Sequence, residues 1–219
     1  MQASSASVEL RISEIFHSLQ GETSRTGLPT VFIRLTGCPL RCTYCDTEYA
    51  FTGGRNMTVA ALLDEVAIHG TRYVTVTGGE PLAQKNCLVL LRTLCDAGYQ
   101  VSLETSGALD VSAVDARVAK VLDIKTPASG EAERNLWSNL DALNAHDEIK
   151  FVLCDEQDYE WAKKVLREKQ LDQKCSVLFS PVTDSLPARQ LAEWILSDQQ
   201  PVRMQIQLHK VIWGNQSGH

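Results

Sequence analysis

The chain has 219 residues, 44% of them hydrophobic and 22% charged, which is enough for one large domain with a substantial buried core. Its formal net charge of −6 argues against a protein whose main task is to bind the phosphate backbone of nucleic acid. On the basis of this charge we expect no nucleic-acid partner. The apolar runs all fall short of the ~20 residues that a membrane-spanning helix needs, so we also expect no membrane partner.

The predicted elements alternate between strands and helices along almost the whole chain. Residues 1–7 have neither the basic nor the apolar region of a secretory signal, and we expect a disordered lead-in there. In chain order, the pattern then predicts a strand over 8–15, a strand over 30–35, a helix over 59–68, a strand over 73–77, a helix over 87–97, a strand over 100–104, a helix over 111–118, a strand over 120–124, a helix over 136–143, a strand over 148–153, a helix over 159–169, a strand over 175–179, a helix over 186–196 and a strand over 202–208. A flexible tail is expected over 214–219.

Repeated strand-then-helix units predict a mostly parallel sheet in a single α/β domain over residues 8–213. In folds of this kind, the active site lies at the carboxyl ends of the strands. The motifs described next all fall at such strand ends, which indicates that they contribute to one site.

Seven cysteines are an odd number in a chain without an export signal, which favours a metal site or free thiols over a disulfide framework. Four of them are scattered through predicted helices and strands, where we expect small buried apolar side chains: Cys87, Cys95, Cys154 and Cys175. The other three, Cys38, Cys42 and Cys45, lie within eight residues of one another after the second predicted strand.

Three thiolates with this spacing can surround one compact metal centre. A tetrahedral zinc site needs a fourth ligand, which His17 or His69 could supply, although nothing in the sequence places either of them near the loop. An iron–sulfur cube held by three cysteines instead leaves one iron without a protein ligand, where a small molecule can bind. The glycine and proline around the cysteines favour the open iron–sulfur cluster over zinc and over three incidental thiols.

The segment from Cys38 to Cys45, with Tyr44 before the last cysteine, resembles the signature of the radical S-adenosylmethionine (SAM) superfamily. The resemblance implies a 4Fe–4S cluster on the three cysteines, SAM bound to the open iron, and hydrogen abstraction by a 5′-deoxyadenosyl radical. It also implies a full or partial (β/α) barrel of mostly parallel strands, in agreement with the alternation of elements. The segment Gly78-Gly79-Glu80-Pro81 resembles the superfamily motif that holds the amino group of SAM, for which its carboxylate and carbonyl groups are suitable acceptors.

Further segments resemble the 7-carboxy-7-deazaguanine synthase family within that superfamily. They are spread over nearly the whole chain: Leu19-Gln20-Gly21-Glu22, residues 32–38, Cys45-Asp46-Thr47, residues 104–107, residues 123–127 and Gln207-Leu208-His209-Lys210. The family reaction, which the resemblance implies, converts 6-carboxy-5,6,7,8-tetrahydropterin into 7-carboxy-7-deazaguanine with ring contraction and loss of ammonia, in queuosine and other deazapurine biosynthesis. The resemblance also implies a Mg²⁺ ion beside the substrate.

The same resemblance implies roles for individual residues. Besides the three cysteines, Thr47 is expected to be catalytic as the Mg²⁺ ligand, because its hydroxyl is a hard oxygen ligand. The residues expected to contact SAM are Tyr44, Cys45, Asp46, Gly79, Ser106, Asp123, Lys125 and Ser180. The residues expected to contact the substrate are Leu19, Gln20, Gly21, Arg34, Thr77 and His209, among which Arg34 suits a carboxylate. Glu22 is suited to the amino-pyrimidine edge of the pterin.

The chain departs from the family pattern in three places. Asp123 begins Asp-Ile-Lys where many members have Ser-Pro-Lys, so Lys125 carries over better than Asp123. Ser180 precedes a proline where members often have glutamine. The chain also continues past Trp213, beyond the point where some members end, so we expect no role for a terminal carboxylate.

Two other functions share part of this evidence. An activase that installs a glycyl radical on a partner protein would have the cysteine spacing and the Gly-Gly-Glu-Pro segment, but not the segments around Gln20 and His209. A non-catalytic zinc-binding module would contain zinc without iron or labile sulfide. The family resemblance further implies flavodoxin or ferredoxin as the electron donor, a homodimer and a cytoplasmic location.

Overall fold

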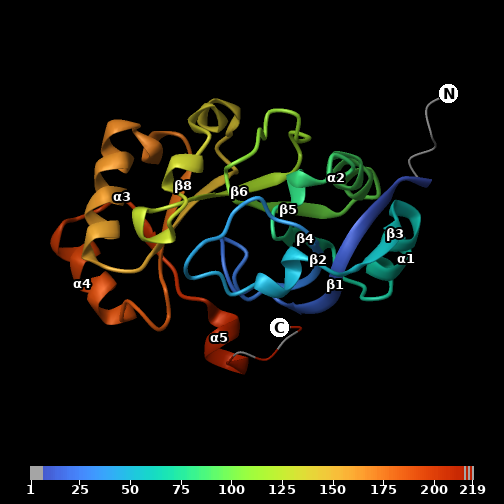
Figure 1. Ribbon diagram of the computed structural model, residues 1–219, viewed down its shortest axis with the longest axis horizontal. Coiled ribbons are helices and arrows are strands. Elements are labelled where there is room, and N and C mark those ends of the chain that lie inside the picture. Colours follow the sequence, from blue (N-terminus) through green and yellow to red (C-terminus); the bar gives the residue numbers. More distant parts are fainter. Residues whose placement is uncertain (1–6, 215, 217, 219) are drawn as a thin grey trace.

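The computed structural model describes residues 7–214, 216 and 218 of the chain, and Figure 1 shows their arrangement. Residues 1–6 of the predicted lead-in and residues 215, 217 and 219 of the predicted tail lie outside the described residues. Nine strands form one sheet in the order β3-β1-β2-β4-β5-β6-β7-β8-β9. They are β1 (Glu9–Leu19), β2 (Pro29–Leu35), β3 (Arg55–Thr58), β4 (Tyr73–Gly78), β5 (Gln100–Thr105), β6 (Ala119–Ile124), β7 (Glu148–Leu153), β8 (Ser176–Pro181) and β9 (Arg203–Met204).

Most of the sheet is parallel, as the sequence predicts. Strand β1 pairs antiparallel with β2 and β3, whereas β2 and β4 to β9 run parallel to one another. The carboxyl ends of β2 and β4 to β9 therefore meet at the same edge of the sheet.

Helices cover one face of this sheet. They are α1 (Val59–Ala67), α2 (Cys87–Asp96), α3 (Glu156–Glu168) and α4 (Ala188–Ser197), whereas the short α5 (Leu208–Trp213) contributes no residue to the core beneath them. In Figure 1, α1 and α2 lie toward one end of the sheet, α3 and α4 lie toward the other, and α5 stands apart near the end of the chain. The predicted helix over 136–143 is a 3-10 helix over Trp137–Ala142. None of the helices within the described part of the chain has the length and apolar character needed to cross a bilayer.

Alternation along the strands gives the sheet two chemically different faces. In β4, Val74 and Val76 belong to the hydrophobic core beneath the helices, whereas the intervening Thr75 and Thr77 lie on the opposite face. The same alternation in β5 places Glu104 on that opposite face. One face of the sheet therefore packs apolar side chains against the helices, and the other face carries hydroxyl and charged groups.

The predicted helix over 111–118 is wrong. Turns occupy this segment, with a hydrogen bond of 3.0 Å from the Val114 N–H to the Val111 carbonyl. The carboxylates of Asp110 and Asp115 accept the backbone N–H groups two residues later, at 2.8 and 3.0 Å. Such side chain–backbone bonds compete with the hydrogen bonds of a helix, which explains why helical apolar spacing does not produce one here.

The predicted strand over 202–208 is also wrong for most of its length, because β9 has only two residues. The Gln205 N–H still donates to the Phe179 carbonyl at 2.9 Å, beside the sheet. The chain then leaves the sheet, and the Leu208 N–H donates to the Gly21 carbonyl at 3.0 Å at the start of α5. The end of the chain is thereby brought to the connection between β1 and β2.

Candidate active site

A cavity of about 790 Å³ lies on the polar face of the sheet, at the carboxyl ends of β2, β4, β5, β6 and β7. Its lining includes the loop after β2, the turn after β4 and the last part of the chain. All the predicted site residues except Ser180 line it: Leu19, Gln20, Gly21, Arg34, Cys38, Cys42, Tyr44, Cys45, Asp46, Thr47, Thr77, Gly79, Ser106, Asp123, Lys125 and His209. The fold therefore brings to one place seven segments that are separate in sequence: 19–21, 34, 38–47, 77–79, 106, 123–125 and 209.

The cysteine loop is fixed to the segment after β6. The Thr43 hydroxyl donates to the Ala128 carbonyl at 2.6 Å, and the Arg41 N–H donates to the Glu131 carboxylate at 2.6 Å. The Arg41 guanidinium donates to the Cys38 carbonyl at 2.8 Å and lies 4.2 Å from the centre of the Phe51 ring. These contacts hold an irregular loop in a defined shape.

The three thiols of this loop, Cys38, Cys42 and Cys45, are partly buried and unpaired with other cysteines. Burial raises the pKa of each thiol, and neighbouring thiolates would raise the pKa of Cys38 and Cys42 further. The Lys125 ammonium acts in the opposite direction on all three. The donor set is therefore three thiols around one cavity wall, with a positive charge close by.

The two glycines after β4 allow the backbone to approach this loop closely. A Cβ at Gly79 would lie 2.4 Å from the Gly37 carbonyl oxygen and 2.7 Å from the Cys38 Cβ. A Cβ at Gly78 would lie 2.2 Å from the Leu35 carbonyl oxygen, and this residue has φ +149°. Only glycine fits at these two positions, so the turn and the cysteine loop form one packed unit.

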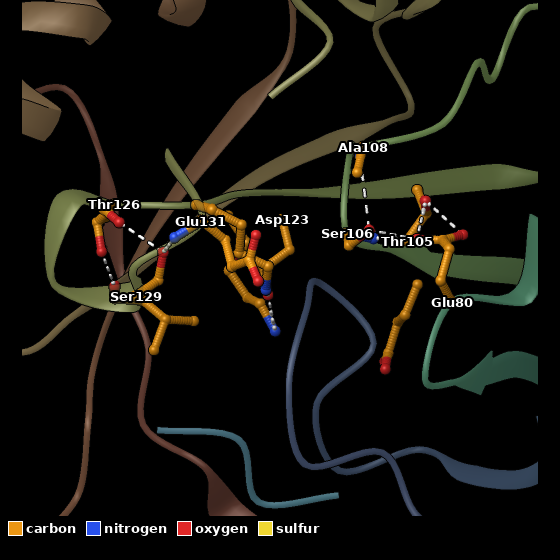
Figure 2. Close-up of polar contacts among 12 residues, drawn as sticks. Glu80, Thr105, Ser106, Ala108, Asp123, Thr126, Ser129 and Glu131 are labelled. Atoms are coloured by element: carbon orange, nitrogen blue, oxygen red, sulfur yellow. Dashed lines mark hydrogen bonds and ion pairs between the residues drawn. The ribbon is translucent and has the colours of Figure 1, made fainter. Parts of the chain in front are cut away.

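The glutamate of the same turn is used inside the fold and not in the cavity. Glu80 is fully buried, and its carboxylate accepts from the Thr105 hydroxyl at 2.9 and 3.0 Å and from the Leu82 N–H at 3.0 Å. It also accepts from the Ser106 N–H at 2.7 Å and from the Ser106 hydroxyl at 2.5 Å. Figure 2 shows the contacts with Thr105 and Ser106, in which the Glu80 carboxylate points toward the end of β5. The expectation that this carboxylate can receive an ammonium group is therefore wrong, and the exposed backbone of the turn is left for that role.

Hydroxyl and carboxyl groups from β4 and β5 form the floor of the cavity. The Gln20 amide donates to the Thr75 hydroxyl at 3.2 Å and to Glu104 Oε1 at 3.3 Å. The Thr77 hydroxyl donates to Glu104 Oε2 at 2.9 Å. Burial raises the pKa of Glu104, which favours its neutral form relative to an exposed glutamate. The sequence does not assign Glu104, although it lies in one of the segments that carry the family resemblance.

Opposite charges alternate along the wall made by β6 and β7. Lys125 Nζ lies 3.0 Å from Asp123 Oδ2. Lys150 Nζ lies 3.7 Å from the same oxygen and 2.7 Å from Glu22 Oε2. Although burial acts to raise it, the Lys150 ammonium holds the pKa of Glu22 below its ordinary value. The second oxygen of Asp123 is buried without a hydrogen-bond partner in the described structure. An unpaired acceptor in a cavity wall is suited to a polar group of a ligand.

The last part of the chain closes one side of the cavity. The Gln207 amide donates to Glu22 Oε1 at 2.8 Å and to Asp46 Oδ2 at 3.4 Å, and Lys210 donates to Asp46 Oδ2 at 2.9 Å. Although burial acts to raise it, the hydrogen bond and charge of Lys210 hold the pKa of Asp46 well below its ordinary value. Burial lowers the pKa of His209, which favours the neutral imidazole. The segment thus joins the Leu-Gln-Gly-Glu connection to the cysteine loop.

Gly21 leaves room for the His209 imidazole, which lies where a side chain at residue 21 would be. A Cβ at Gly21 would lie 2.0 Å from His209 Nδ1. Replacement of Gly21 by alanine is expected to displace the imidazole and to reduce turnover roughly ten-fold, with little loss of stability because the side chain can move. A cycle of Gly21→Ala, His209→Ala and the double variant, measured as kcat/KM, should show strong non-additivity. Fully additive losses would show that the two residues act independently.

Ser180 is the one predicted site residue that the structure places elsewhere. It lies in β8, is 2% exposed, and pairs with Val152 of β7. Val152 lines the cavity, but Ser180 does not, and the lining resumes at Val182. The predicted contact between Ser180 and SAM has no support in this placement.

Several lining residues have no role assigned from the sequence: Glu14, Tyr49, Glu104, Lys150, Gln207 and Lys210. Lys150 lies between Ile149 and Phe151 in a strand whose other charged residue, Glu148, stands at its first position, and a charge in the middle of such a strand is the signal that could have found it. Glu14 has the parity of the core residues Leu10 and Ile12, and it faces the cavity because the register of β1 against β2 shifts between Ile12 and Glu14, which simple alternation does not predict. No local signal distinguishes Tyr49, which depends on tertiary structure.

Comparison with known proteins identifies the family. The Radical SAM superfamily model matches residues 32–168. The 7-carboxy-7-deazaguanine synthase of Chlorobaculum tepidum is 48% identical over 212 residues, which cover 95% of this chain and 96% of that protein. The chain belongs to the 7-carboxy-7-deazaguanine synthase family. The synthase of Koribacter versatilis is 45% identical and covers 93% of this chain and 97% of its own.

A solved structure agrees with this membership of the synthase family. The crystal structure of QueE from Escherichia coli superimposes with a TM-score of 0.77 at 26% identity, over 92% of this chain and 95% of that one. The α/β fold of the radical SAM type that the sequence predicts is therefore confirmed, and the chain is a radical SAM enzyme of this family. Membership implies a 4Fe–4S cluster and SAM as cofactors.

The zinc-module alternative has no ligand set in this structure. His17 and His69, the two candidates for a fourth ligand, pack on each other with ring centres 5.1 Å apart, and neither lines the cavity. Within the described part of the chain, no three histidine, cysteine, aspartate or glutamate side chains are placed to hold a single ion. A 4Fe–4S cube is larger than one ion, so its thiolate ligands stand farther apart than those of zinc.

Proposed function

We propose that this protein is a ring-contracting lyase that converts 6-carboxy-5,6,7,8-tetrahydropterin into 7-carboxy-7-deazaguanine with loss of ammonia, for queuosine or another deazapurine. The observation that carries the proposal is that one cavity joins three elements. These are the cysteine loop, the Gly78-Gly79 turn and the Leu-Gln-Gly connection after β1. The rival activase would need only the first two of them.

In this proposal, Cys38, Cys42 and Cys45 bind the 4Fe–4S cluster, and their partial burial around one wall fits that group. When bound, the cluster and SAM supply a carbon radical that abstracts a hydrogen atom from the substrate. The Gly79 backbone leaves room for the amino-acid part of SAM, and the unpaired oxygen of Asp123 is an acceptor for a polar group.

Three more residues complete the proposed SAM site. Tyr44 and Asp46 flank the last cysteine, and Lys125 lies beside the thiols and keeps its positive charge there, since Asp123 raises its pKa despite burial. Ser106 contributes by holding Glu80 and so the turn, because its hydroxyl already donates to that carboxylate. Its part is therefore indirect.

The pterin is assigned to the floor made by Gln20, Thr77 and Glu104. A fused aminopyrimidine has donors and acceptors along one edge, which the Gln20 amide, the Thr77 hydroxyl and the Glu104 carboxyl group can match. Leu19 and Gly21 contribute backbone and apolar surface, and His209 closes the side next to Gly21. Arg34 binds the substrate carboxylate, and a guanidinium fits that planar group.

Thr47 is the residue proposed to hold Mg²⁺. Its hydroxyl donates to Asp46 Oδ1 at 2.8 Å, which leaves the oxygen lone pairs available to a cation. Mg²⁺ typically takes few protein ligands, while substrate and water complete its shell. The ion would supply charge stabilisation beside the substrate carboxylate.

The cellular setting is proposed on the family resemblance. The enzyme takes electrons from flavodoxin or ferredoxin, works as a homodimer in the cytoplasm, and has no nucleic-acid or membrane partner. The exposed apolar side chains of α5, Val211 and Ile212, are compatible with a subunit contact.

The reaction is tested with anaerobically reconstituted protein, SAM, Mg²⁺, a reductant and carboxytetrahydropterin, with the products identified by mass spectrometry. Formation of 7-carboxy-7-deazaguanine supports the proposal. Formation of 5′-deoxyadenosine alone would mean that the substrate is wrong and would favour the activase. If neither product forms with a fully loaded cluster, the proposed reaction is excluded.

A further inference from the structure

The guanidinium of Arg34 is held along one edge only. Its Nε donates to Glu14 Oε1 at 2.6 Å, and its centre lies 5.7 Å from the Phe16 ring centre and 5.9 Å from the Tyr49 ring centre. Among the residues that the structure describes, the two terminal nitrogens of Arg34 have no hydrogen-bond partner. The part of the guanidinium best suited to a two-point contact with a carboxylate is therefore left for a ligand in the cavity.

Glu14 is placed beside Arg34 by the pairing of β1 and β2. The two residues are partners in the antiparallel register, so their side chains lie on the same face. Their side chains are 23% and 16% exposed, and both line the cavity. A charged hydrogen bond in such a partly enclosed position restricts an arginine far more than one in open water does.

A second donor connects this pair to the cysteine loop. The Tyr49 hydroxyl donates at 2.7 Å to the same oxygen of Glu14 that Arg34 uses. Tyr49 lies in the 3-10 helix η2 (Glu48–Phe51), which begins directly after Thr47. That turn is fixed in place, because the Ala50 N–H donates to the Thr47 carbonyl at 2.9 Å and the Ala50 carbonyl accepts from the Gly37 N–H at 2.8 Å. One carboxylate oxygen thus links β2 with the loop that carries the cluster ligands.

We infer that Glu14 is a positioning residue that, together with Tyr49, aims Arg34 at the carboxylate of the pterin and so sets the preference for a carboxylated substrate. The inference rests on the proposed function, since it takes Arg34 as the group that binds that carboxylate. Without Glu14, the arginine side chain samples several rotamers and must be ordered anew each time the substrate binds. Removal of Glu14 therefore weakens binding of the substrate carboxylate and leaves the bond-breaking steps unchanged.

The test compares the binding of 6-carboxypterin and of pterin, which differ only in the carboxylate, to the reconstituted holoenzyme. The measured quantity is the ratio of their two affinities, by anaerobic calorimetry. Arg34→Ala should bring the ratio close to one. Glu14→Ala should lower it roughly ten-fold, the usual scale for one hydrogen bond to a charged group, while Glu14→Gln, which keeps an acceptor oxygen, should retain most of it. Under turnover, Glu14→Ala should raise KM and leave kcat within about two-fold.

Two further variants make the outcome decisive. Glu48→Ala, an exposed carboxylate of the same turn that does not line the cavity, is the matched control and should leave the ratio unchanged. Tyr49→Phe removes a hydroxyl from a side chain that is 55% exposed, so it should fold normally even where Glu14→Ala does not, and it should lower the ratio about three-fold.

An unchanged ratio in folded Glu14→Ala, or in Tyr49→Phe where Glu14→Ala does not fold, overturns the inference and leaves the proposed function intact. A wild-type enzyme that binds neither pterin overturns the proposed function and the inference with it. A ten-fold loss that Glu14→Gln restores supports both.

Discussion

Replacement of Cys42 by alanine is expected to abolish cluster assembly and to reduce formation of 7-carboxy-7-deazaguanine by more than ~100-fold, because removal of a direct ligand should cost more than removal of a residue that only orients one. The structure offers no substitute thiol, since within the described residues only Cys38, Cys42 and Cys45 among the cysteines line the cavity. Burial raises the pKa of Cys42, so the free thiol is protonated at neutral pH and must release a proton when it binds iron. Iron and sulfide analysis and the electron paramagnetic resonance of the reduced protein measure the expected loss.

Cys95→Ala is the matched control for this variant. Cys95 is also partly buried, but it lies in α2 on the helix-covered face of the sheet and does not line the cavity. It should keep its cluster, its cleavage of SAM and its product. A Cys42→Ala protein with a full iron and sulfide content would contradict the assignment of the cluster to this loop.

The sequence predicts which residues form the site better than it predicts the contacts that hold those residues in place. Sequence motifs predict residues that the fold must bring to a strand end, and Cys38, Gly79 and Lys125 all follow strands whose carboxyl ends share one edge. Alternation in β4 predicts buried Val74 and Val76 in the same way. Both inferences depend on short-range patterns, which the sequence records directly.

Contacts between distant segments leave no comparable record. The sequence predicts that the segment after β9 extends the sheet, but hydrogen bonds from Gln207 to Glu22 and Asp46 place it beside the cavity instead. Glu22 and Asp46 precede Gln207 in the sequence by 185 and 161 residues. The position of Lys150 opposite Glu22 has the same origin. Such pairs become predictable only after the sheet order is known.

Glu80 shows how a motif can be recognised correctly while one of its side chains is given the wrong task. The sequence of the Gly-Gly-Glu-Pro segment predicts that this carboxylate accepts from the amino group of SAM. In the structure the carboxylate instead joins the turn after β4 to the end of β5, through Leu82, Thr105 and Ser106. The segment still borders the cavity, but it does so through the Gly78 and Gly79 backbone.

Replacement of Glu80 by alanine is accordingly expected to lower the free energy of unfolding by at least ~3 kcal/mol, because several buried donors lose their only strong acceptor and each unsatisfied group costs about 1–3 kcal/mol. The backbone N–H groups of Leu82 and Ser106 cannot turn to find another partner. Urea unfolding of the anaerobic apoprotein measures the effect. Asp64→Ala, which removes an exposed carboxylate of α1, is the control and should change stability by less than ~0.5 kcal/mol.

Glu80→Gln separates a structural role from a direct role in binding SAM. The glutamine keeps the shape and one acceptor oxygen, but its NH₂ group faces donors, so we expect an intermediate loss of stability together with a weaker affinity for SAM, in proportion to that loss. The proportion follows from the structure, since a loosened Glu80 releases the Gly79 backbone that it holds against Gly37. If Glu80→Gln bound SAM weakly while its unfolding midpoint stayed at the wild-type value, the carboxylate would be acting on the cofactor itself. The two measurements on this variant therefore decide whether Glu80 stabilises the turn from inside the fold or binds SAM directly.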